Sequence, residues 1–288
     1  MTYDYTLKII NAVGIEYELS HDTDNIIIDK VEGLDPPPVD VNTAYSPTDG
    51  TSFRSAHAQQ RNIVLHLALI GDVEAQRLRL YKMFTPKQAL TLFFTNRLRD
   101  VKTVCYVETP EFDIYAKPER AVISLICPSP WLESAVPVDY EPGYEVPTFE
   151  PPFSIELDEP IPFSEVVDHP TSIIVNRGDS KVGFTAKITF TGEVTGLKIT
   201  TETTGDFFKL DYSFQSGDVL TLDTRHGKLS VICRRSGSTA DSNLIFYIAD
   251  GSRWVKLPVG VNRVGITATT GLSYITAEIS VSLLYGGV

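Results

Sequence analysis

The chain has 288 residues, of which 42% are hydrophobic and 22% charged, and its formal net charge is −12. This length favours two domains, the composition argues against a disordered protein, and the negative charge argues against binding to a nucleic-acid backbone. No apolar stretch approaches the roughly 20 residues of a membrane-spanning helix, and the acidic, polar N-terminus does not resemble a signal peptide. We therefore expect a protein that folds in a cytoplasm and does not enter a membrane.

Residues 1–135 show strand patterns that are interrupted by one helix pattern. Ile63, Leu65, Leu67 and Leu69 recur at a period of two, which is typical of a strand with one buried face. Similar apolar runs lie at 5–10, 25–31, 89–95, 102–107, 112–116 and 120–127. We expect a β domain built from these runs.

A helix is predicted after Gly71. Asp72 can cap it and Glu74 lies in its first turn, while Pro86 disfavours the helical conformation at Thr85. Apolar positions recur at spacings of three and four, at Leu78, Leu80, Tyr81 and Phe84. This one helix is expected to cover a face or an end of the sheet.

A connector separates the two halves of the chain. Residues 136–170 contain eight of the 18 prolines and nine acidic residues, but no lysine or arginine. Proline fixes φ and removes a hydrogen-bond donor, so this stretch predicts an extended, solvated segment. We expect an N-terminal domain at 1–135, a linker at 136–152 and a C-terminal domain at 153–288, whose first strand is predicted at 153–157.

The C-terminal half reads as strands alone. Phe184, Ala186, Ile188 and Phe190 alternate with polar residues, as in a half-buried antiparallel strand. Further runs lie at 197–201, 207–210, 219–223, 228–233, 244–248, 261–269 and 273–285, and glycine-containing turn signals separate many of them. Many short strands at regular spacing predict a sandwich or a barrel.

No constellation of residues predicts chemistry. The five histidines form no HExxH motif, no serine lies in a GxSxG motif, and no phosphate-binding glycine loop is present. The three cysteines lack CxxC spacing and lie in apolar runs, which favours buried thiols over a disulfide framework. We therefore predict no catalytic, metal-binding or cofactor-binding residues and no enzymatic activity.

Aromatic side chains are the remaining candidates for ligand binding. The rings of Trp254, Tyr140, Tyr144 and Trp131 could stack on sugars, because a flat apolar ring matches a pyranose face. The alternative is that these rings pack in a core or an interface. We favour packing for Trp254 and keep glycan binding as an open alternative.

Short motifs follow one another in a fixed order through the N-terminal half. They are VEGLDPP at 31–37, DG at 49–50, RNIVL at 61–65, LYKMF at 80–84 and ISLICPSPW at 123–131. This ordered set resembles the distal tail protein family of long-tailed phages that infect Gram-positive bacteria, which usually has an aspartate in place of Ser129. The residues that carry the resemblance are Gly33, Leu34, Pro36, Asp49, Gly50, Arg61, Asn62, Tyr81, Phe84, Cys127, Pro128, Pro130 and Trp131.

The C-terminal half resembles the same family. Its motifs are NRGD at 176–179, GDVL at 217–220, LPVGVN at 257–262 and YGGV at 285–288. The residues singled out are Gly178, Asp179, Gly217, Asp218, Gly260 and Asn262. The chain departs from the family at Thr195-Gly196-Leu197, where many members have an Asn-Pro pair in a turn.

The resemblance implies a mainly β protein of two domains. The N-terminal domain would be a β-sandwich with one α-helix that forms a homohexameric ring, single or stacked, around a central channel. The C-terminal domain would be a galectin-like antiparallel β-sandwich that projects outward. The family-motif residues would then serve structure and assembly.

The resemblance also implies partners and a location. One face of the ring would bind the tail tube protein, and the other would bind the tail-associated hub or lysin protein. The outer domains could carry receptor-binding proteins, and DNA would pass through the channel without specific binding. The protein would assemble in the host cytoplasm and reside at the virion tail tip, where it joins the tail tube to the adsorption apparatus.

Three alternatives remain open at this point. A glycan-binding tail module would attach directly to the host cell wall through the sandwich. A tail-associated hydrolase would need an acid, a base or a metal in a pocket. The equivalent subunit of a contractile tail or of a phage-derived bacteriocin would show the same sequence pattern.

Overall fold

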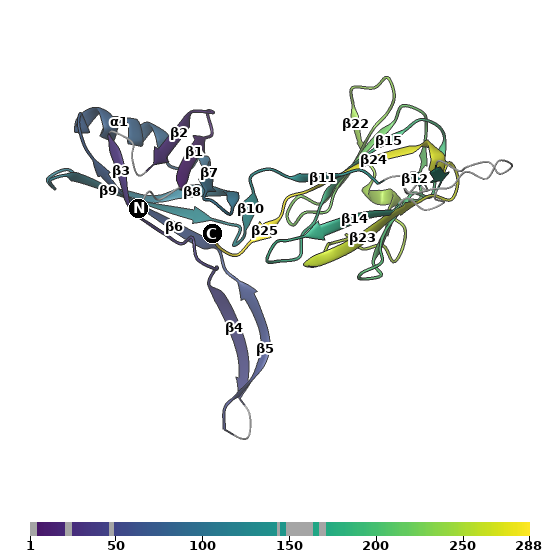
Figure 1. Cartoon of the computed structure of the whole chain (residues 1–288), viewed down its shortest axis with the longest axis horizontal. Helices are drawn as coiled ribbons and strands as arrows, with labels where there is room; N and C mark the ends of the chain where they lie inside the picture. Colours follow the sequence, from purple (N-terminus) through teal and green to yellow (C-terminus); the bar gives the residue numbers. More distant parts are fainter. Residues whose placement is uncertain (1–4, 21–24, 46–48, 143–144, 148–163, 167–170) are drawn as a thin grey trace, which may run out of the picture. The chain divides into compact units, whose positions relative to one another are not determined.

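The computed structural model describes residues 5–20, 25–45, 49–142, 145–147, 164–166 and 171–288 (Figure 1). The chain forms two compact units. The N-terminal unit consists of Met1–Val136 together with Leu284–Val288, and the C-terminal unit consists of Pro137–Leu283. Among the described residues, no helix has the length and apolar character needed to cross a lipid bilayer. The predicted architecture is confirmed for the described residues: it is mainly β, with two domains and one α-helix.

The N-terminal unit is built on one curled antiparallel sheet. Its main path runs in the order β2-β1-β7-β8-β9-β6-β3. The strands are β1 (Thr6–Asn11), β2 (Glu16–Ser20), β3 (Ile26–Glu32), β6 (Arg61–Leu69), β7 (Ala89–Thr95), β8 (Asp100–Asp113) and β9 (Glu119–Cys127). Two short strands, β10 (Leu132–Ser134) and β25 (Leu284–Tyr285), join this sheet beside β8.

The predicted alternation at 61–70 is confirmed. Strand β6 pairs with β9 from Arg61 opposite Cys127 to Leu69 opposite Glu119, and Ile63, Leu65, Leu67 and Leu69 all lie in the core. Their side chains point to one face because successive residues of a strand alternate between faces. The other strands of this sheet's main path, the helix that follows β6, and β10 also contribute large apolar residues to this core.

The predicted helix is α1 (Val73–Met83). The carboxylate of Asp72 accepts a hydrogen bond from the N–H of Ala75 at 3.2 Å, which is the expected cap, and Phe84 ends the helix. Leu80, Met83 and Phe84 are buried in the core, whereas Leu78 and Tyr81 are exposed. Each residue turns the helix by about 100°, so Leu78 points nearly opposite Leu80.

A long hairpin leaves the N-terminal sheet between β3 and β6. It consists of β4 (Val39–Tyr45) and β5 (Thr51–Ala58), which pair only with each other among the described residues, and it extends away from the sheet (Figure 1). We call residues 39–58 the arm. The apolar runs identified in the sequence do not include these strands.

The C-terminal unit is a sandwich of two antiparallel sheets. The larger has the order β11-β24-β15-β20-β21-β22, with β11 (Val138–Tyr140), β24 (Ile275–Val281), β15 (Thr185–Phe190), β20 (Val219–Asp223), β21 (Ser230–Arg234) and β22 (Asp241–Asn243). The smaller has the order β14-β23-β17-β18, with β14 (Thr171–Asn176), β23 (Gly260–Thr267), β17 (Lys198–Thr201) and β18 (Phe207–Lys209).

Short elements complete this unit. They are the pairs β12 (Glu145–Pro147) with β13 (Ser164–Val166) and β16 (Val194–Thr195) with β19 (Ser213–Phe214), and the 3-10 turns η1 (Ile245–Tyr247) and η2 (Leu272–Tyr274). The predicted alternation of Phe184, Ala186, Ile188 and Phe190 is confirmed, since all four are buried. The run predicted as a strand at 244–248 instead contains η1.

The chain passes between the units twice, at Val136–Pro137 and at Leu283–Leu284. Part of the predicted linker is a strand of the C-terminal unit, because β11 pairs with β24 from Val138 opposite Val281. A three-residue edge strand tolerates the flanking prolines. The last five residues return to the N-terminal unit, unlike the predicted boundary of 153–288. The strand predicted at 153–157 lies outside the described residues.

Candidate assembly surface and the junction at its base

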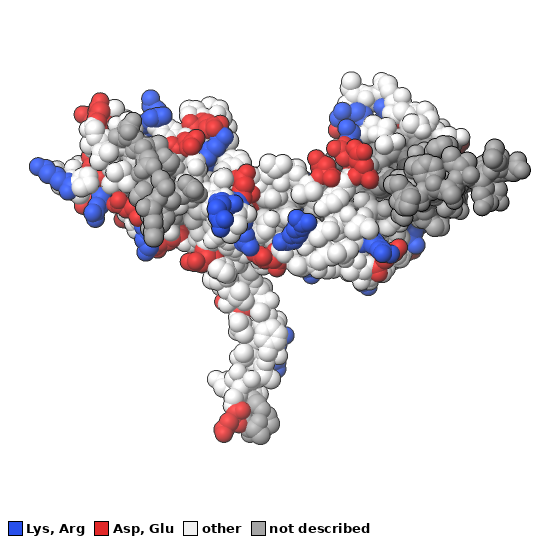
Figure 2. Space-filling view, viewed as in Figure 1, with Lys and Arg blue, Asp and Glu red and all other residues white. Residues whose placement is uncertain are grey.

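The arm exposes apolar side chains along its length. Val39, Val41 and Phe53 are 51%, 58% and 67% exposed, and Tyr45 near its end is 96% exposed. Most of the arm surface is uncharged (Figure 2). An apolar surface of this kind is typical of a segment that binds another protein.

The backbone of the arm is also available for pairing. Each strand of the arm uses one edge for the ladder from Val39 opposite Ala58 to Tyr45 opposite Thr51. Among the residues that the structure describes, neither strand has a second neighbour. Its outer N–H and C=O groups can therefore bind a strand of another chain, as exposed sheet edges do.

A buried arginine lies at the base of the arm. Arg61, the first residue of β6, is 1% exposed, and all five guanidinium N–H groups donate to backbone carbonyls. The acceptors are the oxygens of Gly33 and Asp35, both at 2.6 Å, Pro130, which accepts from two nitrogens, and Gly286. We call Arg61 and its four acceptor residues, Gly33, Asp35, Pro130 and Gly286, the junction. Burial lowers the pKa of Arg61, while Cys127 and Asp35 oppose that shift.

The C-terminal tail, residues 284–288, lies against the same place. The N–H of Val288 donates to the oxygen of Leu34 at 3.2 Å, and Arg99 donates to the oxygen of Gly287. The Arg99 guanidinium also lies 4.6 Å from the centre of the Tyr285 ring. Several contacts besides Arg61 therefore hold the tail on the N-terminal unit.

Two glycines make this packing close. Gly33 has a φ of +81°, and a Cβ at that position would lie 1.9 Å from the oxygen of Asn62. A Cβ on Gly287 would lie 2.9 Å from the oxygen of Leu34 and 3.3 Å from the nitrogen of Pro36. A larger residue at either position would push backbone segments apart.

The structure brings many of the N-terminal motif residues to this region. Gly33, Arg61 and Pro130 belong to the junction, and Leu34, Pro36 and Asn62 contact the tail or Gly33. Cys127 is buried opposite Arg61, while the short segment that follows β9 contains Pro128 and Trp131. The remaining residues lie elsewhere, Asp49 and Gly50 in the turn of the arm and Tyr81 and Phe84 at the end of α1.

The C-terminal motif residues build turns. The N–H of Gly178 donates to Asn176 Oδ1 at 2.9 Å, and Asp179 follows in the same bend. Asp218 is buried and accepts from the N–H groups of Gln215 and Ser236, next to Gly217. Asn262 is buried and donates to the oxygens of Pro258 and Gly260. These contacts stabilise the loops of the sandwich.

The aromatic candidates that the structure describes lie on different elements of the chain. The Trp254 ring is half-buried and its centre lies 5.0 Å from that of Phe208, at an angle of 36°. Tyr140 lies on the edge strand β11, and Tyr144 lies outside the described residues. The contact with Phe208 favours a packing role for Trp254.

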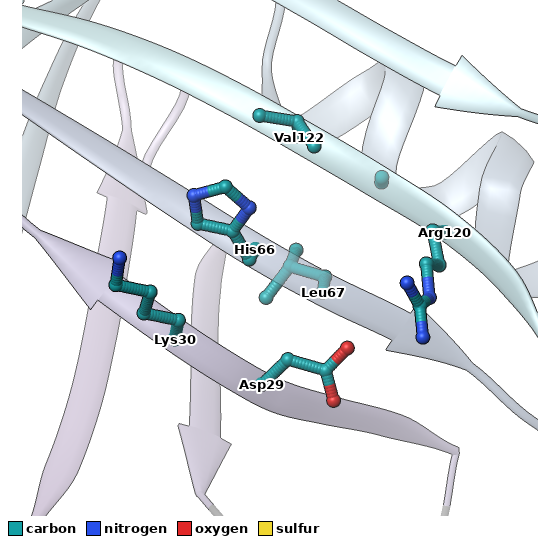
Figure 3. Close-up of a pocket in the computed structure, with 7 residues that line it drawn as sticks. Asp29, Lys30, His66, Leu67, Arg120 and Val122 are labelled. Carbon is teal, nitrogen blue, oxygen red and sulfur yellow. The ribbon is translucent and has the colours of Figure 1, made fainter.

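A small open pocket lies on the outer face of β3, β6 and β9 (Figure 3). Asp29, Lys30, His66 and Arg120 line it together with apolar residues. Glu32 Oε1 lies 2.8 Å from Lys30 Nζ and 3.1 Å from His66 Nε2. The hydrogen bond from Lys30 lowers the pKa of Glu32, and His66 adds to this effect. Among the described residues, no three metal-ligating side chains gather here or elsewhere.

The arm was the main feature absent from the sequence prediction. A signal for it exists, because Val39, Val41, Thr43 and Tyr45 alternate at a period of two before the turn at Asp49-Gly50. The partners of Arg61 carry no such signal, since a backbone carbonyl belongs to every residue type. The junction can be seen only in the folded chain.

Comparisons with known proteins agree with this fold. Residues 177–277 match the family model of the siphovirus-type tail component, C-terminal domain. The sequence has no match among curated proteins. The crystal structure of the SPP1 Dit protein, described as a paradigm of the hub adsorption apparatus of phages that infect Gram-positive bacteria, superimposes with a TM-score of 0.67 at 12% identity, over 96% of this chain and 98% of that one.

Two structures of the phage p2 baseplate in its activated conformation, with strontium and with calcium, give TM-scores of 0.54 and 0.52. Both are 10% identical and cover 96% of this chain and 97% of the matched chain. The resemblance noted in the sequence is confirmed. Residues 177–277 match the siphovirus-type tail component family model, and the chain as a whole has the same fold as the SPP1 Dit protein.

Proposed function

We propose that this chain is a non-enzymatic structural protein of a phage tail tip. Six copies form a ring that joins the tail tube to the adsorption apparatus, and DNA passes through its channel. The family match over the C-terminal unit and the whole-length fold similarity support a role in the tail. The observation that carries the ring is the arm, a hairpin with exposed apolar side chains whose strands pair only with each other within the described part of the chain.

The arm suits a contact between identical subunits in a ring. In a closed ring each subunit presents two different surfaces, one to each neighbour. A projecting hairpin supplies one of these surfaces, and the neighbouring N-terminal unit supplies the other. Burying Val39, Val41 and Phe53 at such an interface removes apolar area from water, which stabilises the assembly.

The charge of the chain fits a channel that DNA crosses. The net charge of −12 repels phosphate backbones at ordinary ionic strength. A ring of this protein would let DNA move through without binding it. The remaining surfaces of the ring would bind the tail tube protein and the tail-associated hub protein, and the C-terminal units would carry receptor-binding proteins.

The test is the mass of the purified protein, measured by light scattering and compared with negative-stain images. We expect six times the chain mass of 31.9 kDa, or a multiple of that for stacked rings. The double variant Val41→Asp, Phe53→Asp should reduce the mass to that of the single chain. The matched control is Val259→Asp, which changes a side chain of the C-terminal unit that is 58% exposed, as Val41 is. A wild-type protein that stays monomeric at every concentration would contradict the ring.

A further inference from the structure

Arg61 connects three segments that lie far apart in the sequence. Gly33 and Asp35 precede the arm, Pro130 follows β9, and Gly286 lies in the C-terminal tail. The first segment determines where the arm starts. The other two lead directly to the two places where the chain passes between its units, through β10 to Val136–Pro137 and from Leu283–Leu284 through β25.

The two segments that pass between the units also pair with each other, close to the residues that bind Arg61. Strands β10 and β25 pair, with Leu132 opposite Tyr285 and Glu133 opposite Leu284. The N–H of Val288 then binds the oxygen of Leu34, next to the acceptors Gly33 and Asp35. A displacement of the tail would therefore disturb residues 33–35, just before the arm, in two ways. It would break the backbone hydrogen bond from Val288 to Leu34, and it would remove the Gly286 acceptor from the Arg61 guanidinium.

The guanidinium has no spare donor. Its five N–H groups are all used, and it is buried, so the loss of one acceptor leaves a charged donor without a partner and away from water. The close approaches at Gly33 and Gly287 leave little room for the backbone segments to rearrange. The seating of the tail and the position of the arm base are therefore linked in free energy.

We propose that Arg61 is a positioning residue that couples the C-terminal tail to the arm, so that the arm base is ordered only while the tail is seated. A force or a binding event that acts on the C-terminal unit would reach the arm through Leu283–Leu284 and the junction. Its meaning for assembly rests on the proposed ring. The coupling itself is a property of the single chain.

The test is hydrogen exchange of individual backbone amides, read by mass spectrometry or NMR. The reporters at the arm base are Gln59, whose N–H donates to the oxygen of Pro38 at 2.9 Å, and the neighbouring Val39–Ala58 pair. Deleting residues 286–288 should speed exchange at these amides by about tenfold or more. Arg61→Lys should do the same, because an ammonium has three donors in place of a five-donor fork.

Two controls limit the interpretation. Arg77→Lys replaces another guanidinium of the same unit, whose Nη1 donates to both carboxylate oxygens of Glu119 at 3.0 Å and 3.1 Å, and should leave the arm base unchanged. Amides of β15 and β20 in the C-terminal unit should keep their wild-type rates in every variant. Arm-base rates within twofold of wild type in the chain without residues 286–288 would overturn the proposal.

A second measurement needs no variant. In the wild-type chain under mild denaturant, the amide of Val288 and the amide of Gln59 should exchange through one shared opening, with equal dependence on denaturant. Independent openings would overturn the coupling. Light scattering on the same samples keeps the proposals apart, since a monomeric wild type contradicts the ring alone and independent openings contradict the coupling alone.

Discussion

The arm and the pair β15–β20 of the C-terminal unit are both antiparallel ribbons, yet they use their side chains in opposite ways. In β15 the side chains of Ala186, Ile188 and Phe190 are buried while the residues between them are not. In β4 and β5 nearly every residue is exposed, apolar ones included. Buried and exposed residues alternate along β15 because one face of its sheet lies in the core of the sandwich. Neither face of the arm is buried.

This difference indicates where each ribbon obtains its stability. The pair β15–β20 belongs to a six-stranded sheet and packs on a second sheet. An isolated two-stranded hairpin is only marginally stable in water. The order of the arm must therefore come from its ladder, from the junction at its base and, in the proposed ring, from a neighbouring subunit.

The largest expected contrast comes from truncating one apolar side chain in each ribbon. Ile188→Ala should lower the free energy of unfolding by about 2–5 kcal/mol, because it removes buried apolar area and leaves a cavity. Val41→Ala should change it by less than about 0.5 kcal/mol in a sample kept monomeric by dilution. Chemical denaturation measures both, and a comparable loss for Val41→Ala would mean that the arm packs on its own chain.

A glycine pair tests whether the base of the arm is closely packed. Gly33→Ala should cost about 2–5 kcal/mol, from the left-handed conformation and from the contact with the Asn62 oxygen. Gly14→Ala is the matched control, since Gly14 has a φ of +83° with nothing within 4 Å, and should cost about 1–2 kcal/mol. Thermal and chemical unfolding compare them, and equal costs would remove the argument for close packing at Gly33.

Two aspartate variants compare the contribution to stability of a buried carboxylate in the sandwich with that of an exposed carboxylate on the arm. Asp218→Ala should cost about 1–3 kcal/mol, because it removes the acceptor of the N–H groups of Gln215 and Ser236. Asp40→Ala on the arm removes only an exposed bond to Gln59 and should cost less than about 0.5 kcal/mol. If the two variants unfold at the same denaturant concentration, the turn at 215–218 does not depend on its carboxylate.

The sequence predicts those elements of the fold that bury one face, because their apolar residues then recur at a regular spacing. The strands at 61–69 and 185–190 and the helix at 73–83 follow from apolar spacing, because one face of each element enters a core. The arm was not predicted in this way, because neither of its faces is buried. Strand β11 was hidden by the surrounding prolines, which are compatible with an edge strand of three residues.

The junction could not have been derived from the sequence. Arg61, Gly33 and Pro130 were selected as parts of a family pattern, without a reason for their association. The reason is geometric, since one guanidinium binds carbonyls from three distant segments. The return of the tail to the N-terminal unit could not be derived from the sequence either, because only the pairing of β25 with β10 in the folded chain reveals it.

The smallest effect is expected on the outer face of β3, where a surface ion pair contrasts with the buried junction. Lys30→Met should raise the pKa of Glu32 toward its ordinary value, because the hydrogen bond from Lys30 is the main cause of the lowered pKa. A lowered pKa in the folded state stabilises the protein above the unfolded pKa, and that contribution is lost as the pH falls through the folded value. Glu32 is exposed, so the stability should hardly change, and NMR titration of its carboxyl is the suitable measurement. An unchanged pKa in the variant would assign the shift to His66, at 3.1 Å from the same oxygen.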